Sequence, residues 1–380
     1  MDNSFSSPPP LTPPPVIIAP PPSKPRKCRG WMIVAIILFA LLGFSWFVFI
    51  AHSVSRALSF NNGFNRTFKT ANARQIGPKL DEYILQDNDA RSKIAVVTVD
   101  GIITSHTADQ AGNSMVDVIK AQLDRAADDN RVKAVILKVD SPGGEVMASD
   151  EINKVISKFQ TDSKKPVICS MGSLAASGGY YISAPCRWIV ANELTITGSI
   201  GVIMHGYNYR GLMDKIGVMP MTFKSGKFKD MLSPDRSTNE IPPEEHAMVQ
   251  SLIDETYQKF KGVVAEGRSQ AHDKNGKEGK PLADDWTKYA DGRVVSGTEA
   301  LKLGFVDELG DFDDAVDRAE KIVHISDANL IEYRERYDIS DLFSMFGQSG
   351  ASHDIKLDLG VDIPKLQANA MYFLWEAPEN

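Results

Sequence analysis

The chain has 380 residues, a formal net charge of −7 and an isoelectric point near 5.6. This charge argues against a nucleic-acid-binding protein, which would normally present a basic face. Its three scattered cysteines give neither a disulfide framework nor a Cys/His spacing typical of zinc, so we expect no metal site. The length exceeds that of a usual single core and predicts one large α/β domain with appended elements, or two lobes.

Residues 1–30 contain ten prolines, in runs such as Pro8–Pro10 and Pro20–Pro22. Such a segment cannot bury enough apolar surface to fold, which predicts a disordered cytoplasmic tail with some polyproline II character. Two roles stay open for it: a simple spacer, or a ligand for a proline-recognising partner.

Residues 31–51 form an uncharged, apolar run of 21 residues, long enough to cross the ~30 Å hydrocarbon core as a helix. Four basic residues precede it: Lys24, Arg26, Lys27 and Arg29. By the positive-inside rule, we expect a single-pass membrane protein whose N-terminus is cytoplasmic and whose remaining chain is extracytoplasmic. A cleaved signal peptide is the alternative, but its apolar core is normally shorter, about 7–15 residues.

After a linker or stalk over residues 52–92, the pattern changes to alternating strand and helix signals. Short β-branched runs predict strands over residues 94–99, 133–139, 166–170 and 187–191, with a fifth candidate over 218–223. Helical spacing is found over residues 115–127 and 145–159. Repeated β-α-β units of this kind predict an α/β fold whose sheet is mostly parallel and covered by helices on both faces.

The α/β domain predicted from this pattern covers residues 93–324, and residues 325–380 form a C-terminal extension. Within that extension, the apolar cluster over residues 371–375 is either a docking helix or a contact for a partner. Cys169 follows an apolar run and is expected to be a buried strand residue, although a Cys169–Cys186 disulfide stays open in an oxidising compartment.

Ligand chemistry in such sheets gathers at the carboxyl ends of the strands. That rule selects two glycine-rich loops, residues 140–144 and 171–179, which we expect to meet above one edge of the sheet. Taken alone, each Gly-Gly turn is more often structural. Together, their backbone N–H groups could form an oxyanion hole beside a cleft in which an extended peptide pairs as an added strand.

Ser177 is the candidate nucleophile, because small residues flank it and Gly178 and Gly179 follow it. We expect it at a crowded strand-to-helix turn with its hydroxyl exposed. The competing serines nearby are Ser141, Ser149, Ser173, Ser183 and Ser199.

A serine nucleophile needs a base. The G-x-S-x-G elbow is absent, and His205 is the nearby downstream histidine, with no clear Ser-His-Asp order. A lysine can serve if burial lowers its pKa by roughly three from the usual ~10.4. Three lysines lie in one apolar-flanked segment, Lys224, Lys227 and Lys229, and spacing alone does not choose among them.

Four motifs in order, Asp140–Gly144, Ser170–Tyr181, Thr197–Val202 and Phe228–Pro234, resemble those of the signal peptide peptidase A family. The resemblance covers roughly residues 93–320, including the closing pattern over 291–307, and fits the short, single-repeat form.

That resemblance implies a Clp-protease/crotonase-like fold and a serine peptidase with a Ser-Lys dyad. Matched residue by residue, it makes Ser177 the nucleophile and Lys229 the base, with Ser199 orienting the lysine. The oxyanion donors would be the backbone N–H groups of Gly178 and Gly144, with Gly143 a weaker candidate.

The resemblance also implies a ring-shaped homo-oligomer whose dyads form across protomer boundaries. Expected substrates are remnant signal peptides or other extended apolar peptides near the membrane, and no cofactor is required. Two alternatives are a non-catalytic scaffold of the same fold and a crotonase-like acyl-CoA enzyme. Translocation of the domain argues against the second alternative, since CoA thioesters are cytoplasmic.

Overall fold

The computed structural model describes residues 77–105, 113–336 and 371–374. All of these belong to the second of two units into which the chain divides, Ile76–Asn380. The predicted tail and the predicted anchor over residues 31–51 lie outside the described residues. Within the described ranges, no helix is long and apolar enough to cross a membrane.

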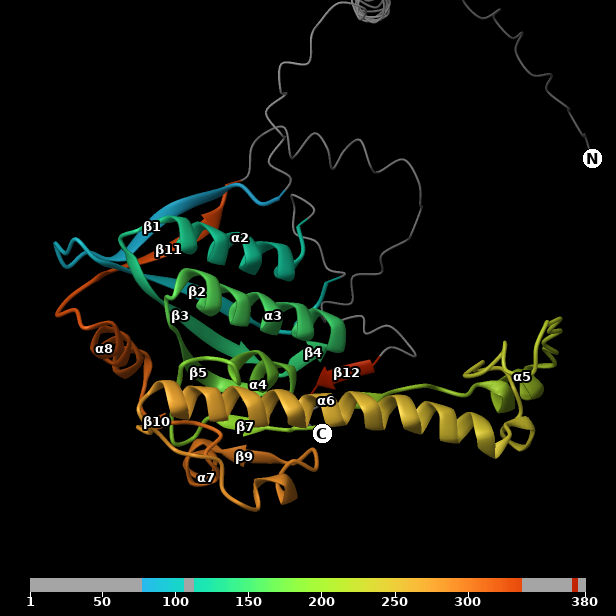
Figure 1. The fold of residues 1–380 in the computed structure, drawn as a ribbon. Helices are drawn as coiled ribbons and strands as arrows, with labels where there is room; N and C mark the ends of the chain where they lie inside the picture. Colours follow the sequence, from blue (N-terminus) through green and yellow to red (C-terminus); the bar gives the residue numbers. More distant parts are fainter. Residues whose placement is uncertain (1–76, 106–112, 337–370, 375–380) are drawn as a thin grey trace, which may run out of the picture. The chain divides into compact units, whose positions relative to one another are not determined.

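A nine-stranded, mainly parallel sheet lies at the centre of the described unit (Figure 1). Its strands, in spatial order, are β1 (Leu80–Gln86), β11 (Asn329–Glu335), β2 (Lys93–Asp100), β3 (Val132–Ser141), β5 (Val167–Ala176), β6 (Trp188–Ala191) and β10 (Glu308–Leu309). Only β1 in this series pairs antiparallel with its neighbour. The remaining strands, β7 (Ile196–Gly198) and β9 (Val294–Ser296), extend from the end of β5.

A second, three-stranded antiparallel sheet lies at the carboxyl end of the main sheet's strands. Its order is β4 (Gly143–Glu145), β12 (Met371–Leu374) and β8 (Ile203–Met204). The apolar cluster at the C-terminus is therefore a strand in its described part, and not a docking helix.

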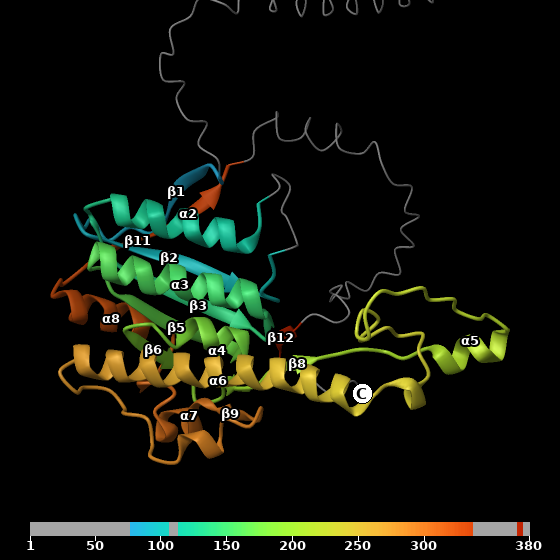
Figure 2. The same cartoon turned by 45° about the vertical axis from the view of Figure 1, so that its right-hand side comes forward.

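Helices cover both faces of the main sheet, as predicted (Figures 1 and 2). On β3, alternate residues face opposite sides: Val135 and Leu137 belong to one core, and Ala134 and Ile136 to the other. The first core packs against α2 (Met115–Asp128) and α3 (Val146–Ser163), and the second against α8 (Phe312–Val323). The other helices are α4 (Gly178–Ser183), α5 (Arg210–Ile216), α6 (Pro243–Lys274) and α7 (Gly297–Leu303), with 3₁₀ turns η1 (Thr238–Glu240) and η2 (Trp286–Lys288).

The four principal strand predictions and both helix predictions are confirmed, because these segments pack into the two cores. The fifth strand, over residues 218–223, is wrong: the segment forms no strand, and Met219, Met221 and Phe223 are exposed. Apolar character alone cannot make a strand where no neighbouring strand offers a ladder. Two strands on one side of the sheet also come from outside the predicted domain. The edge strand β1 comes from the predicted linker, and its neighbour β11 comes from the predicted extension.

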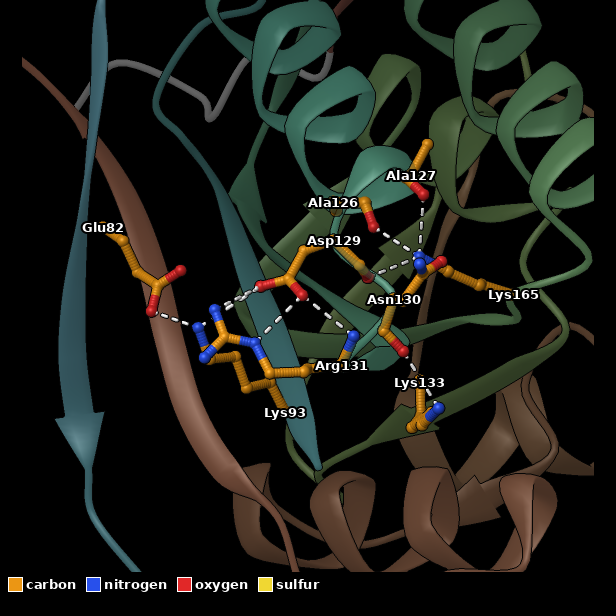
Figure 3. A network of polar contacts seen from close by, with 9 residues as sticks. All are labelled: Glu82, Lys93, Ala126, Ala127, Asp129, Asn130, Arg131, Lys133 and Lys165. Atoms are coloured by element: carbon orange, nitrogen blue, oxygen red, sulfur yellow. Dashed lines mark hydrogen bonds and ion pairs between the residues drawn. The ribbon is translucent and has the colours of Figure 1, made fainter. Parts of the chain in front are cut away.

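A polar network closes the end of the sheet opposite the glycine loops (Figure 3). Lys165 Nζ donates to three carbonyls at the C-terminus of α2, those of Ala126, Ala127 and Asp129, at 2.7–2.9 Å. The carbonyls of Ala126 and Ala127 lie in the last turn, where the helix itself offers no N–H, so the lysine satisfies them. The Asp129 carbonyl also accepts from Val132 N at 3.0 Å. Asp129 also accepts hydrogen bonds from Arg131 and Lys93. Burial alone would raise the pKa of Asp129, but these bonds lower it to about 2.

Asp129→Asn should lower the free energy of unfolding at pH 7 by about 1 kcal/mol, a figure already reduced for solvent screening. The folded pKa of about 2 lies below the usual 3.8. The carboxylate's contribution to the free energy of unfolding is therefore full above about pH 5 and is lost as the pH falls toward 2. Urea unfolding of both proteins from pH 7 to pH 3 measures this.

The exposed neighbour Asp128 provides a control, and Asp128→Asn should change stability by less than about 0.5 kcal/mol. A difference between wild type and Asp129→Asn that does not shrink on acidification would contradict the assignment.

Candidate active site

Ser177 lies at the turn between β5 and α4, as expected. Its backbone adopts φ 55° and ψ −116°, a conformation that costs energy for a residue with a side chain. Two hydrogen bonds hold the turn: Ser177 N donates to Gly198 O at 2.8 Å, and Tyr181 N donates to Ser177 O at 2.8 Å. Ser177 is only 1% exposed, so the expectation of an exposed hydroxyl is wrong for this arrangement.

The two glycine-rich loops meet at this turn. A Cβ added to Gly178 would lie 3.0 Å from both Gly143 Cα and Gly144 N. The backbones of the two loops therefore touch, because none of the three residues carries a side chain. N–H groups in the first turn of a helix have no partner within it, so that of Gly178 is free to point at a ligand. The expected meeting of the loops is confirmed.

The loop from Ser141 to Glu145 is itself held by a segment that follows β2. Ile103 N donates to Gly143 O at 2.9 Å, and Glu145 N donates to Ile103 O at 2.8 Å. A Cβ on Gly144 would lie 1.9 Å from Ile103 O, so glycine is required there. This role of Ile103 has no signal in the sequence, since a bridge of one residue has no periodicity.

Ser199 lies close in the fold to Ser177. It follows β7, has φ 50° and donates from its backbone N–H to Arg293 O at 2.8 Å. The preceding residue, Gly198, is the one whose carbonyl binds Ser177 N. At 6% exposure, Ser199 is buried beside the candidate nucleophile's turn.

Lys229 is not brought to Ser177 in this chain. It is exposed, between α5 and α6, and in the described residues no hydrogen bond joins it to the serine. Its neighbours interact among themselves, with Lys224 Nζ 2.7 Å from Asp230 Oδ1. Figures 1 and 2 show α5 beyond the N-terminal end of α6, away from the main sheet. We call residues 205–242, which include Lys229, the arm.

The competing serines have other surroundings. Ser141 Oγ accepts from Gly143 N at 3.1 Å, and Ser183 Oγ donates to Gly179 O at 2.7 Å. Both hydroxyls thus form hydrogen bonds with backbone groups. Ser173, by contrast, is exposed on β5. Ser149 is the exception, because its Oγ is buried without a hydrogen-bond partner and lies 2.7 Å from where a Cβ on Gly178 would be.

Tyr181, four residues after Ser177, links three helices below the turn. Its hydroxyl donates to Asp150 Oδ1 at 2.8 Å, and Asp150 also pairs with Lys154 and Lys259, each at 2.7 Å. Burial and the bond to Asp150 raise the pKa of Tyr181. Burial alone would raise the pKa of Asp150, but the two lysines and the tyrosine lower it. The Tyr181 side chain is thereby fixed as a neutral donor.

The two cysteines of the domain are free, buried thiols. Cys169 lies on β5, as expected for a strand residue, and its Sγ is 3.3 Å from Ser183 Oγ. Burial raises the pKa of Cys186 well above its usual range. The disulfide left open by the sequence is not formed. In the described part of the chain, no group of three or more His, Cys, Asp or Glu side chains is placed to hold a metal ion.

Known proteins that match this chain identify its family. The model of "Peptidase family S49" matches residues 159–326, which include the Ser177 turn and Lys229. A protein of Enterococcus faecium named "Putative signal peptide peptidase SppA" is 36% identical over 282 residues, covering 72% of this chain and 74% of the relative. The chain belongs to peptidase family S49. It is a serine peptidase of this Ser-Lys dyad family.

A second relative agrees with the family assignment. A Synechocystis protein named "Putative protease slr0021" is 41% identical, with 59% of this chain and 72% of the relative covered. Among solved structures, a membrane-bound stomatin-specific protease in complex with a substrate peptide matches weakly. Its TM-score is 0.38 at 19% identity, over 68% of this chain and 98% of that one.

The contact between the loops predicts that Gly178→Ala damages the site. The methyl group would meet Ser149 Oγ at 2.7 Å and the Gly143–Gly144 backbone at 3.0 Å. We expect a loss of about 2 kcal/mol in stability from overpacking. Peptidase activity should fall about 100-fold, comparable to removing one oxyanion donor. Urea unfolding and hydrolysis of a fluorogenic peptide measure the two effects.

Gly262→Ala is the matched control, since a Cβ there meets nothing within 4 Å. The double variant Ser149→Ala, Gly178→Ala should regain part of the stability but little activity, because the backbone contact persists. Full activity in Gly178→Ala would show that the contact is not needed.

Proposed function

We propose that the protein is a membrane-anchored serine endopeptidase with a Clp-protease/crotonase-like catalytic domain, in which Ser177 is the nucleophile and Lys229 the base. The observation that carries the proposal is the contact of Gly178 with Gly143 and Gly144 at the strained Ser177 turn. It puts backbone donors from two loops beside one hydroxyl-bearing residue, as acyl transfer requires. Gly178 N and Gly144 N are the proposed oxyanion donors, with Gly143 N less favoured.

In the proposed mechanism, neutral Lys229 takes the Ser177 proton while Oγ attacks the scissile carbonyl carbon. The backbone N–H groups of Gly178 and Gly144 stabilise the oxyanion. Lys229 then protonates the leaving amine, and the acyl group stays on Ser177 Oγ as an ester. A water molecule, deprotonated by the same lysine, hydrolyses the ester. Ser199 is proposed to orient the lysine, in keeping with its burial beside the Ser177 turn.

The exposed position of Lys229 favours a dyad formed between two copies of the chain. The arm carries large apolar side chains with little cover: Tyr207, Leu212, Ile216, Met219, Met221 and Phe223 are 61–90% exposed. Such a concentration of exposed apolar surface is typical of a protein interface. In a ring-shaped homo-oligomer, docking of the arm on the next protomer would bury Lys229 beside that protomer's Ser177. Burial makes a lysine easier to deprotonate.

The proposed substrates are extended, apolar peptides, including remnant signal peptides, in keeping with the name of the Enterococcus relative. An apolar peptide emerging from a membrane would reach a catalytic domain tethered there by residues 31–51. The basic residues before that segment orient the domain to the extracytoplasmic side.

Two inactive variants test both the dyad and its crossing between copies. Ser177→Ala and Lys229→Ala should each lower peptide hydrolysis by on the order of 1,000-fold or more. Co-expressed in equal amounts, they should regain activity at about a quarter of the sites, where an intact serine meets a neighbour's intact lysine. Fluorogenic peptide turnover and fluorophosphonate labelling of Ser177 provide the measurement.

Lys227→Ala is the matched control, because Lys227 is exposed in the same arm. Its Nζ lies 3.5 Å from Glu244 Oε1 and 4.8 Å from the centroid of the Phe228 ring. The variant should keep wild-type activity. Absence of regained activity in the co-expressed pair would place the dyad within one chain. A fully active Ser177→Ala would exclude the nucleophile itself.

A further inference from the structure

The turn that carries Lys229 has no apolar core beneath it. None of residues 205–242, the arm, is buried. A base that takes part in catalysis must nevertheless be held in place, since a displacement of about 1 Å can lower the rate about 100-fold. Polar contacts therefore have to fix this turn.

Arg236 makes the contacts that close the turn. Its Nη1 donates to Asp230 O at 3.2 Å, and its Nη2 donates to Glu240 O at 2.6 Å. Asp230 directly follows Lys229, so the guanidinium holds the backbone next to the proposed base. A planar guanidinium can bind several oxygens at fixed angles, which the single ammonium group of a lysine cannot do.

A buried carboxylate ties Arg236 to α6, at whose N-terminal end the arm lies (Figures 1 and 2). Glu245, in the first turn of this helix, is only 3% exposed, and both of its oxygens accept from Arg236 Nη1, at 2.8 and 3.0 Å. The next buried residue of the helix is Phe260, in the core. A carboxylate is rarely buried unless a cation pairs with it. The Lys229 turn is thus connected through Arg236 and Glu245 to the helix that packs on the domain.

Other cations occupy the carboxylate beside Lys229. Lys224 Nζ lies 2.7 and 2.8 Å from the two Asp230 oxygens, and Arg236 Nη1 lies 3.4 Å from Oδ1. The bond from Lys224, with the charge of Arg236, lowers the pKa of Asp230. In the described part of the chain, the side chain of Lys229 has neither a hydrogen bond nor an ion pair. An ion pair would favour the charged form of the lysine, so this arrangement suits a base that must be neutral.

We propose that Arg236 and Glu245 form a clamp that positions Lys229 for the reaction. This rests on the function proposed above and adds two positioning residues to it. Arg236 fixes the backbone at Asp230, and Glu245 fixes Arg236 on α6. Neither residue touches the substrate. The clamp of one copy serves the active site of the next copy, whose Ser177 meets the lysine.

Arg236→Ala should lower kcat for a fluorogenic peptide about 100-fold and leave KM within about twofold, because the groove and Ser177 are untouched. Its assembly, measured by analytical ultracentrifugation, should match wild type. Arg210→Ala is the matched control, since Arg210 lies in the same arm and its hydrogen bonds are to Asn208 and Asp214. The control should keep wild-type kcat. Wild-type kcat in Arg236→Ala would overturn the inference.

A double variant separates positioning from stability. Arg236→Ala leaves the Glu245 carboxylate buried without its cation, which destabilises the fold. Arg236→Ala, Glu245→Ala removes that charge and should recover part of the lost melting temperature. Its kcat should stay about 100-fold low, because nothing holds the Asp230 carbonyl. Recovery of kcat together with stability would show that the pair serves folding alone.

Co-expression shows in which copy Arg236 acts. Arg236→Ala mixed in equal amounts with Ser177→Ala should regain activity at about a quarter of the sites, where an intact serine meets a neighbour's intact arm. Mixed with Lys229→Ala, it should regain none, because both variants damage the same contribution. A defect at the serine of its own copy would reverse this pattern, and a general folding defect would abolish both gains. Either result would overturn the inference.

Failure of this inference and failure of the proposed function give different results. If Ser177→Ala and Lys229→Ala regain activity together while Arg236→Ala keeps wild-type kcat, only the inference is overturned. If that pair stays inactive although wild type is active, the dyad lies within one chain, and the kcat of the double variant decides the role of Arg236. If wild type neither reacts with fluorophosphonate nor cuts any peptide, both proposals fall.

Discussion

The rest of the site depends on one backbone contact, which joins the glycines of the two loops. Gly178 at the start of α4 lies so close to the other loop that a Cβ on Gly143 would be 2.6 Å from Gly178 N, and a Cβ on Gly178 would be 3.0 Å from Gly143 Cα and Gly144 N. Side chains at these positions would push the two loops apart. Only glycine lets the first turn of a helix and the edge of β4 face the same space with their N–H groups.

Two residues near that contact have strained backbones, and hydrogen bonds elsewhere in the sheet offset the strain. Ser177 and Ser199 both have positive φ, a conformation that costs on the order of 1–3 kcal/mol for each residue. The opposing support is a chain of backbone bonds in which Ser177 N binds Gly198 O and Ser199 N binds Arg293 O. Strand β7 lies between β5 and β9 and transmits this support. Strands β7 and β9 are short, but they fix the serine turn from outside the parallel core.

The sequence predicts the strands that local residue pattern and burial determine. It does not predict those that depend on a pairing partner distant in sequence. The runs around Ile94, Val135 and Ile168 are strands because β-branched residues in a doubly covered sheet leave no other low-energy choice. The run over 218–223 is also apolar, yet it lacks a neighbouring strand and stays largely exposed. The cluster at 371–375 leaves a docking helix or a partner contact open in the sequence, because so short an apolar run has no readable period. The open edges of β4 and β8, invisible in the sequence, make residues 371–374 a strand.

The serine turn and its glycines could be predicted because they follow strands whose carboxyl ends meet. The separation of Lys229 from that turn does not follow from the residues around it. Only the family resemblance implies it, through dyads that cross protomer boundaries, and α6 gives the physical reason. Buried side chains of this helix lie mainly in its second half, at Phe260, Val264, Arg268 and Ala271. Gly267 there approaches the Ala184 carbonyl so closely that a Cβ would lie 2.5 Å from it. The first half carries few buried side chains and leads to the arm. A stiff helix anchored at one end keeps the arm from folding back on its own serine. Under the proposed function, a single copy would then hold a strained serine without its base, and peptide hydrolysis would be confined to the assembled protein.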